Sequence, residues 1–379
     1  MNKQEKRSFW SIPAVQSIVA SILCIIIGLL IGYAVLLIIN PKEATTAIVT
    51  LLKNYFTYPT KAAALKYLGN TLVKTAPLLM CALSIQFCYK VGLFNIGAAG
   101  QYVVGAGVSL YAALAWKCPW FLCLILAMIG GALAGAIVGL LKAYCNVNEV
   151  ISGIMLNWIG LYSVNMLLSN VKEPTSPYTL GLASTNPSGV LPTAGLGQFF
   201  SNNRYVTIAI PMAVVIAIII WIVQTKTVIG YEMRATGLNK EAAKYCGMKE
   251  KKNIVMTLAI GGALAALGAA FFFLSGFQQW ECTQSSVPSM GFNGIAATFL
   301  GALNPIGTIF ASYFIQHITE GGNYLDKKVY PSQISDLVSA IIIYLCGFVL
   351  FFKYFINTQI RIRADRKADE KRQKGGTDK

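Results

Sequence analysis

The chain has 379 residues, of which 55% are hydrophobic and only 12% are charged, and its mean hydropathy is +0.59. Soluble globular proteins are about 25% charged, so this chain has too few charged side chains to cover a water-soluble body, and its apolar content excludes a disordered chain. Its net charge of +16 gathers in segments that flank apolar runs, which is typical of membrane topology signals and not of a nucleic-acid surface. The composition predicts a polytopic membrane protein that binds no nucleic acid.

Ten apolar stretches have the length, or nearly the length, of the roughly 20 residues that a spanning helix needs. In chain order they are 15–39, 70–89, 101–116, 120–141, 149–169, 205–224, 253–276, 292–303, 305–318 and 334–356, of which the eighth and ninth are short. The first follows a basic start but is too long for a signal peptide. An even number of spans puts both termini on one side, and their basic residues indicate the cytoplasm.

Two glycine-rich segments suggest that the chain consists of two related halves. Residues 92–100 (GLFNIGAAG) follow the second span, and residues 291–297 (GFNGIAA) follow the seventh. Because each half has an odd number of spans, the second would be inverted relative to the first, as in many transporters. We therefore predict an all-α fold of about ten transmembrane helices in two inverted five-helix repeats with broken helices.

The predicted domains follow from this span count. They are a cytoplasmic N-terminus (1–14), a first repeat (15–169), an extracellular loop (170–204), a second repeat (205–357) with a cytoplasmic loop (225–252), and a basic cytoplasmic tail (358–379).

Amide side chains mark a candidate substrate pathway. Asn95 and Asn293 lie in glycine-containing segments at membrane depth, where unwound backbone is tolerated only if it is buried in protein or lines a cavity. Asn157 and Asn165 share one stripe of the fifth span with Glu149, and such polar residues either bind substrate or bridge helices. The candidate pathway residues are Phe94, Asn95, Gln101, Asn148, Glu149, Asn157, Trp158 and Asn293.

Charged side chains are expected to be nearly absent from the spans. No Lys or Arg lies well inside a predicted span, and Glu149 is the only acidic residue near a span interior. The lack of a basic clamp argues against a phosphorylated substrate.

The loop 225–252 contains a short amphipathic helix. Asn239 is a suitable N-cap, residues 240–245 are helical in pattern, and Gly247 can end the helix at the C′ position. Such a helix either lies on the membrane surface or docks into the groove of a partner.

These segments resemble a known family. Glu241-Ala-Ala-x-x-x-Gly247 resembles the motif by which ABC importer permeases engage their ATPase subunits. Residues 230–237 (GYEMRATG) are similar to the version found in the branched-chain amino acid, ribose and nucleoside permease superfamily. The segments 92–101, 146–157 and 291–296 resemble its nucleoside (guanosine or uridine) branch, and the resemblance covers roughly residues 70–350. The Leu-Pro pair that ends the motif in other importer families is missing after Gly247.

The resemblance implies a permease subunit of an ATP-driven importer in a bacterial plasma membrane. Its implied partners are an ABC ATPase that binds Mg-ATP, a second and distinct homologous permease chain, and a substrate-binding lipoprotein that delivers nucleosides. The residues it implies in ATPase coupling are Arg234, Gly237, Glu241, Ala242, Ala243 and Gly247. The chain has no Gly-x-x-x-x-Gly-Lys-Ser/Thr loop to hold ATP phosphates, so we expect no catalytic residue, no metal site and no cofactor in it.

Three alternatives compete with this interpretation. A permease for ribose or another simple sugar would use similar amides and rings. A gradient-driven secondary transporter usually has acidic residues or histidines within its spans, and this chain has a single histidine. A membrane-embedded enzyme would need a nucleophile with its base, or a metal set, which the pattern does not provide.

Overall fold

The computed structural model describes residues 13–325 and, beyond them, residues 330, 337–338, 340–341, 344–345, 347–349, 351–359 and 362. Two isolated β-bridges are the only β-structure in this described part, so the predicted all-α class is confirmed there.

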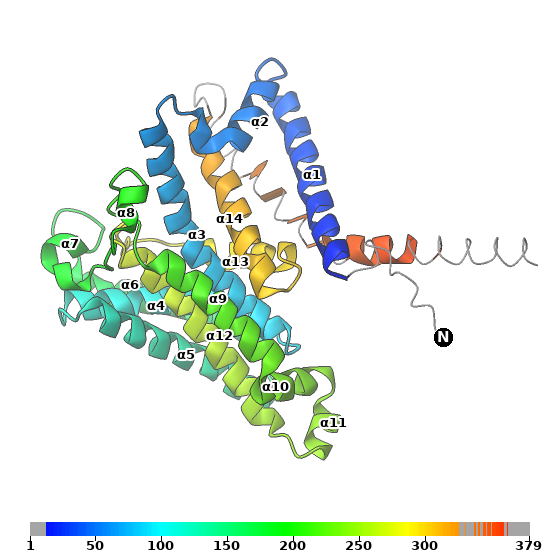
Figure 1. The fold of residues 1–379 in the computed structure, drawn as a ribbon. Coiled ribbons are helices and arrows are strands. Elements are labelled where there is room, and N and C mark those ends of the chain that lie inside the picture. The colour runs from blue at the N-terminus through cyan, green and yellow to red at the C-terminus, as the bar shows by residue number, and fades with distance from the viewer. Residues whose placement is uncertain are drawn as a thin grey trace, which may run out of the picture.

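Nine long or medium helices form the body of the molecule (Figure 1). They are α1 (Pro13–Ile39), α3 (Lys61–Tyr89), α4 (Ala98–Leu114), α5 (Trp120–Cys145), α6 (Glu149–Leu168), α9 (Ala209–Lys226), α12 (Glu250–Phe273), α13 (Met290–Leu300) and α14 (Pro305–Gly321). Each overlaps one of the first nine predicted spans, and the tenth, 334–356, is described only in part, with helical residues from 337 onward. Shorter helices connect them: α2 (Ala44–Lys53), α7 (Leu182–Thr185), α8 (Leu196–Phe199), α10 (Val228–Leu238) and α11 (Lys240–Tyr245).

Six helices of the described part, α1, α3, α5, α6, α9 and α12, are long and apolar enough to cross a membrane. This pattern makes the chain a multi-pass membrane protein. Helix α13 has 11 residues and is therefore about 16 Å long, roughly half the hydrocarbon thickness of a bilayer. The short spans expected around residues 292–318 thus correspond to one short helix, α13, and a longer one, α14.

Helices α3 and α12 lie at the centre of the bundle. In their most apolar stretches 89% and 72% of the residues are buried, against 22–33% in α1, α5, α6 and α9. Close packing is possible because glycines of α5 and α12 face each other: a side chain at Gly131 would overlap the backbone of Gly262, and the reverse is also true. Small residues let membrane helices approach in this way, and the two glycine-alanine runs of the sequence meet here.

Helix α3 starts nine residues earlier than predicted, at Lys61 and not at Asn70. The prediction began with the apolar run, whereas the helix begins at its cap, where the Thr60 hydroxyl accepts a hydrogen bond from Ala63 N at 3.4 Å. As a consequence Lys74 lies midway along α3, well inside the helix, and the expectation that no lysine lies inside a span is wrong.

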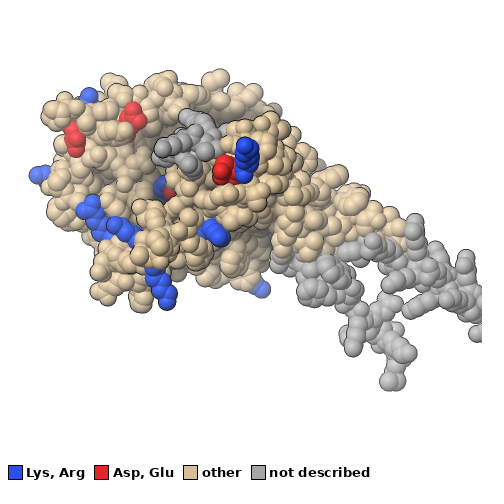
Figure 2. All heavy atoms as spheres, turned by 90° about the horizontal axis from the view of Figure 1, so that it is seen from above, with Lys and Arg blue, Asp and Glu red and all other residues tan. Residues whose placement is uncertain are grey.

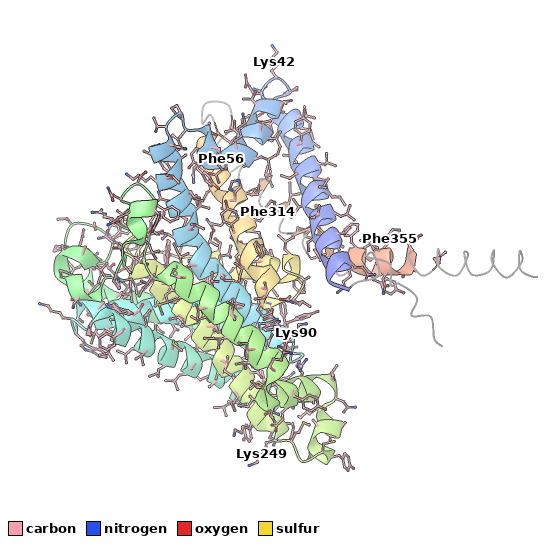
Figure 3. All side chains as sticks on the ribbon, viewed as in Figure 1. Lys42, Phe56, Lys90, Lys249, Phe314 and Phe355 are labelled. Atoms are coloured by element: carbon pink, nitrogen blue, oxygen red, sulfur yellow. The ribbon has the colours of Figure 1, made fainter. Side chains whose placement is uncertain are left out.

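The molecule has two ends, which we call the α11 end and the α2 end after the helices located there (Figure 1). Lys90 and Lys249 lie toward the α11 end, and Lys42 lies at the turn between α1 and α2 (Figure 3). Seen from above, the α2 end is mostly uncharged, with scattered basic and few acidic side chains (Figure 2).

Candidate translocation and coupling site

The chain unwinds between α3 and α4, and Asn95 lies in this unwound segment (residues 90–97). Asn95 is 2% exposed. Its Nδ2 donates to Gln101 Oε1 at 2.8 Å and to Ser84 Oγ at 3.1 Å, and Gln101 Nε2 donates back to Asn95 Oδ1 at 3.2 Å. The two amides therefore satisfy each other inside the protein, as polar groups at this depth must.

Asn157 of α6 fastens the same segment from outside it. Its Oδ1 accepts from Gly100 N at 2.7 Å, and its Nδ2 donates to Ile96 O at 3.2 Å. Asn165, two turns further along α6, also bridges, because its Oδ1 accepts from Trp280 Nε1 at 2.9 Å. Asn157 and Asn165 therefore both connect α6 to other parts of the fold.

The start of α6 combines a cap with an ion pair. The Asn148 side chain accepts from Val150 N at 2.8 Å and so caps the helix. Glu149 pairs with Lys142 at the end of α5, with an N–O distance of 2.8 Å. Asn148 and Glu149 thus fix the turn between α5 and α6 next to the unwound segment.

The two predicted aromatic residues lie in different surroundings. The ring of Phe94, in the unwound segment, meets Tyr89 edge to face with centroids 6.5 Å apart. Trp158 is 42% exposed on the outer side of α6 and stacks on Tyr162 at 6.3 Å. Trp158 therefore points away from the interior that its neighbour Asn157 faces.

The glycine motif of the second half packs directly on that of the first. A side chain at Gly291, at the start of α13, would overlap the backbone of Ala99 in α4. Asn293 is half-buried in regular helix, so the backbone break expected near it lies further on. Residues 301–304 form this break, with Ala302 at φ +55° and Leu303 at φ +57°.

A buried glutamine pair that the sequence analysis missed holds this second break. Gln86 of α3 donates through Nε2 to Leu303 O at 3.0 Å and to Gln224 Oε1 of α9 at 2.9 Å. Both side chains are at most 5% exposed. Isolated glutamines in the apolar runs of two spans were the available signal, since a buried amide in a membrane helix needs a partner.

The second missed feature is an ion pair between α3 and α14. Lys74 Nζ lies 2.7 Å from Glu320 Oε1, and their side chains are 24% and 16% exposed. Lys74 also lies 5.5 Å from the centre of the Phe277 ring. Glu320 escaped notice because α14 continues to Gly321, beyond the predicted end at residue 318, so Glu149 is not the only acidic residue near a span.

Helix α11 forms as the sequence predicted. Asn239 Oδ1 accepts from Ala242 N at 3.0 Å, and Gly247, at φ +80°, ends the helix while Met248 N bonds to Ala243 O at 3.0 Å. Ala243 is buried, whereas Glu241 and Ala242 are exposed. The helix thus presents one face to solvent at the α11 end of the molecule.

Helix α10 connects α11 to the interior. Its Thr236 hydroxyl accepts from Asn253 Nδ2 of α12 at 2.9 Å, and Arg234 Nε donates to Gly230 O at 3.3 Å. At the end of α10, a side chain at Gly237 would overlap the backbone of Val91, in the unwound segment. Backbone therefore touches backbone between α10 and the segment that holds Asn95.

Residues 67–347 match the protein family described as "Branched-chain amino acid transport system / permease component". The chain belongs to this permease family. It is 32% identical over 327 residues to the guanosine ABC transporter permease protein NupP of Bacillus subtilis, which covers 85% of this chain and 90% of that protein. It is also 32% identical over 324 residues to the nucleoside ABC transporter permease protein NupB of Lactococcus lactis, covering 82% and 85%.

A further relative is the guanosine ABC transporter permease protein NupQ of Bacillus subtilis, 28% identical over 254 residues, or 64% of this chain and 77% of that protein. No solved structure matches the chain significantly. The predicted family is therefore confirmed, and the chain belongs among permease components of transport systems.

Proposed function

We propose that this chain is the transmembrane permease subunit of an ATP-driven importer that carries nucleosides into the cell. The observation that carries the mechanism is the backbone contact between Gly237 of α10 and Val91. It connects the exposed helix α11 to the buried amides of Asn95 and Gln101. The nucleoside substrate is proposed because the relatives NupP and NupB bear the names of guanosine and nucleoside permeases.

In the proposed mechanism, ATPase closure displaces α11, and α10 carries the displacement inward. Glu241 and Ala242 lie on the exposed face that would meet the ATPase, while the buried Ala243 anchors α11 to this chain. Val91 moves with Gly237, and the unwound segment shifts against its fastening to Asn157. This shift of the segment alternates the access of the pathway.

The proposed partners follow from what the chain lacks and from its relatives. The sequence has no phosphate-binding loop, so hydrolysis of Mg-ATP is assigned to a separate ATPase subunit. NupP and NupQ are two permease proteins of one organism, which favours a second, distinct permease chain beside this one. A substrate-binding lipoprotein would deliver nucleosides at the α2 end.

The proposed topology keeps ten crossings in two inverted repeats, with both termini and the α11 end in the cytoplasm. The central positions of α3 and α12 support it, because each is the second long helix of its half. Each half also contains a break, at residues 90–97 and 301–304. A matching pair of central helices is expected of repeats that move against each other, although the two breaks follow the second long helix of the first half and the third, shorter one of the second half.

The pathway is proposed to pass the unwound segment 90–97 with only weak contacts to substrate. Asn95, Gln101 and Asn157 spend their hydrogen bonds on the protein, which supports a role in shaping the path. The half-buried Asn293 side chain makes no hydrogen bond to the residues that the structure describes, so its amide could contact a passing solute. Selectivity would then lie mainly in the binding protein.

The test is uptake of labelled guanosine, uridine and ribose by cells with and without this chain. We expect chain-dependent, saturable uptake of a nucleoside that stops when the phosphate-binding lysine of the partner ATPase is replaced. Uptake of ribose without either nucleoside would overturn the substrate assignment and favour the sugar permease. Uptake that survives loss of the ATPase lysine but stops with a protonophore would instead indicate a gradient-driven transporter.

A further inference from the structure

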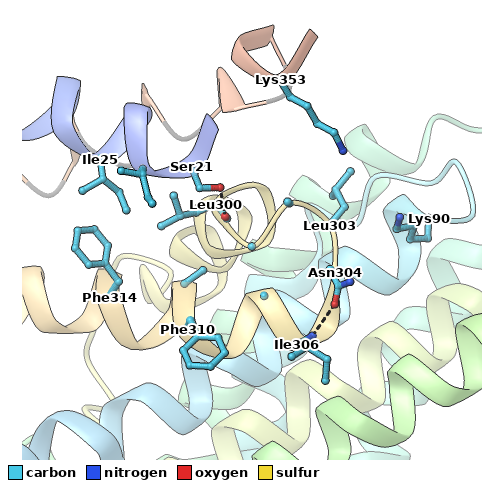
Figure 4. Close-up of a pocket in the computed structure, with 15 residues that line it drawn as sticks. Ser21, Ile25, Lys90, Leu300, Leu303, Asn304, Ile306, Phe310, Phe314 and Lys353 are labelled. Carbon is cyan, nitrogen blue, oxygen red and sulfur yellow. Dashed lines mark hydrogen bonds between the residues drawn. The ribbon is translucent and has the colours of Figure 1, made fainter. Parts of the chain in front are cut away.

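A cavity of about 720 Å³ lies between α1, the break at residues 301–304, and the helical residues around Lys353 (Figure 4). Its volume is within the range of small-molecule sites. Its walls are mostly apolar, and two of the residues that line it, Ile22 and Phe310, are 48% and 72% exposed on the outside of the molecule. The cavity therefore opens onto an apolar outer surface, which in the proposed topology faces the hydrocarbon of the membrane.

Two lysines, Lys90 and Lys353, lie at one end of this cavity, and both reach toward the same space (Figure 4). The two ion pairs between described residues involve other lysines. Partial burial lowers the pKa of Lys90, and the charges of Lys353 and Arg234 lower it further. Lys353 and Arg234 thus each repel Lys90, and an anion beside Lys90 would relieve that repulsion.

A donor on the cavity wall adds to this positive end. Asn304 Oδ1 accepts from Ile306 N at 2.9 Å and caps α14. No described residue uses its Nδ2 group, which remains available for an acceptor oxygen. Ser21 of α1 is already committed, because its hydroxyl donates to Leu300 O at 2.7 Å.

We propose that this cavity binds an anionic phospholipid, with its phosphate between Lys90 and Lys353 and an acyl chain along Ile25 and Phe314. A phospholipid matches both the basic end and the apolar wall of the cavity. A neutral nucleoside gains nothing from two cations, and a free phosphate gains nothing from an apolar wall. Basic pockets between membrane helices are known to hold such headgroups on the cytoplasmic side. This is the side to which the proposed topology assigns Lys90.

Occupancy of the cavity would act on the second break. The residues 301–304 form part of its wall, and Gln86 of the central helix α3 holds the same turn through Leu303 O at 3.0 Å. A lipid in the cavity therefore contacts the joint between α13 and α14 directly. We expect transport to depend on the lipid charge of the membrane.

The experiment is native mass spectrometry of the purified permease–ATPase complex from nanodiscs of phosphatidylcholine and phosphatidylglycerol in equal amounts. We expect the complex to retain phosphatidylglycerol over phosphatidylcholine. Lys90→Gln and Lys353→Gln should each lower that retention about fivefold, the usual effect of one basic residue near an anionic surface. Lys90→Arg keeps the charge and should retain the lipid.

The matched control is Lys42→Gln, which removes a lysine at the other end of α1 and should leave retention unchanged. Equal loss in Lys42→Gln and in the Lys90 and Lys353 variants would overturn the proposal, as would equal retention of both lipids by the unmodified complex. Displacement of the lipid by millimolar inorganic phosphate would show that a free anion suffices, against the acyl-chain contact. Lipid found on the isolated chain but not on the complex would mean that a partner subunit covers the cavity.

Discussion

Both polar groups of the Asn157 side chain bind backbone atoms at, or just before, the start of α4. Its partners Gly100 N and Ile96 O lie in and beside the unwound segment. A buried backbone group without a partner costs about 1–3 kcal/mol, so this one side chain decides whether the turn into α4 is stable. Its effect on transport is therefore expected to come through the shape of the segment.

The first prediction concerns this amide. Asn157→Ala should lower the stability of the purified protein by more than the roughly 1–3 kcal/mol of a single unpaired group, because it leaves two backbone groups unpaired. Nucleoside uptake should slow while the preference between guanosine and uridine stays the same. Thermal unfolding in detergent and competitive uptake measure the two effects. Gln198→Ala, an exposed amide of α8, serves as the control, and a changed preference in Asn157→Ala would speak for direct substrate contact.

The residue scale is also where the sequence was least informative. Amides such as Asn95 and Asn157 could be singled out because a polar group among apolar residues needs a partner. Their partners could not, since the bonds to Gln101 and Gly100 depend on how α4 and α6 meet. Lys74 was missed for a different reason. Hydropathy marks where the apolar run begins, at residue 70, whereas α3 begins nine residues earlier, so Lys74 lies midway along the helix and not near its start.

At the scale of the helices, α5 and α12 approach closely because the glycines at their contact have no side chains. Gly131 faces the backbone of Gly262, whereas its neighbour Gly130 faces the side chains of Val108 and Val104. Gly130 and Gly131 are neighbours in the same helix, so substitutions at the two positions can be compared directly. Only one of them lies where backbone blocks any larger residue.

The second prediction uses this pair. Gly131→Leu should push α5 away from α12 and sharply reduce the amount of folded chain in the membrane, by more than the 1–3 kcal/mol typical of overpacking. Gly130→Leu should be tolerated, because the Val108 side chain can turn aside. Fluorescence-detected gel filtration of the tagged chain measures the outcome. Equal yields of the two variants would mean that α5 and α12 do not pack through Gly131.

The third prediction concerns α11. Glu241→Arg reverses the charge of its exposed first turn, and Gly247→Pro cannot adopt φ +80°, since proline fixes φ near −65°. Both variants should abolish uptake while membrane insertion stays normal, because α11 lies outside the bundle. Uptake and membrane content are measured together, with Lys240→Gln as the control. Normal uptake by both variants would remove the coupling role from this helix.

The contrast between α11 and α3 shows what determines predictability at this scale. The bounds of α11 were predicted to the residue because its signals, Asn239 and Gly247, are local hydrogen-bonding and backbone properties. In the second half, the predicted interruption between the spans 292–303 and 305–318 coincides with the observed break at residues 301–304, whereas the backbone break expected near Asn293 is absent. The positive φ angles of Ala302 and Leu303 could not be predicted, because neither residue is a glycine.

At the scale of the whole molecule, the orientation in the membrane decides how every feature is used. The fourth prediction tests it with single cysteines in a chain whose other cysteines are replaced by alanine. Cys246 follows α11 and is exposed, so a membrane-impermeant maleimide should label it only after cells are opened. A cysteine at the exposed Lys117, between α4 and α5, should be labelled on intact cells. The reverse pattern would invert the proposed topology.

The overall class and family could be read from the sequence because they rest on composition and on motifs far apart in the chain. The arrangement of the spans could not, since hydropathy gives no information on which helices lie in the centre. That α3 and α12 are the buried pair depends on the small residues of α5 and α4 that surround them, and it appears only when all helices are assembled.

Gly237 and Val91 contact each other through main-chain atoms on both sides. The rigidity of this contact is therefore separate from the shape of the exposed surface around it. The fit depends on Gly237 having no side chain, because a Cβ there would overlap the backbone of Val91, and it does not depend on the exposed residues of α11. The exposed surface at the end of α10 and on α11, with Leu238, Glu241 and Tyr245, can therefore change its shape and charge without altering this backbone contact. In the proposed transporter, the surface that meets the ATPase could change while the backbone contact between Gly237 and Val91 stays the same.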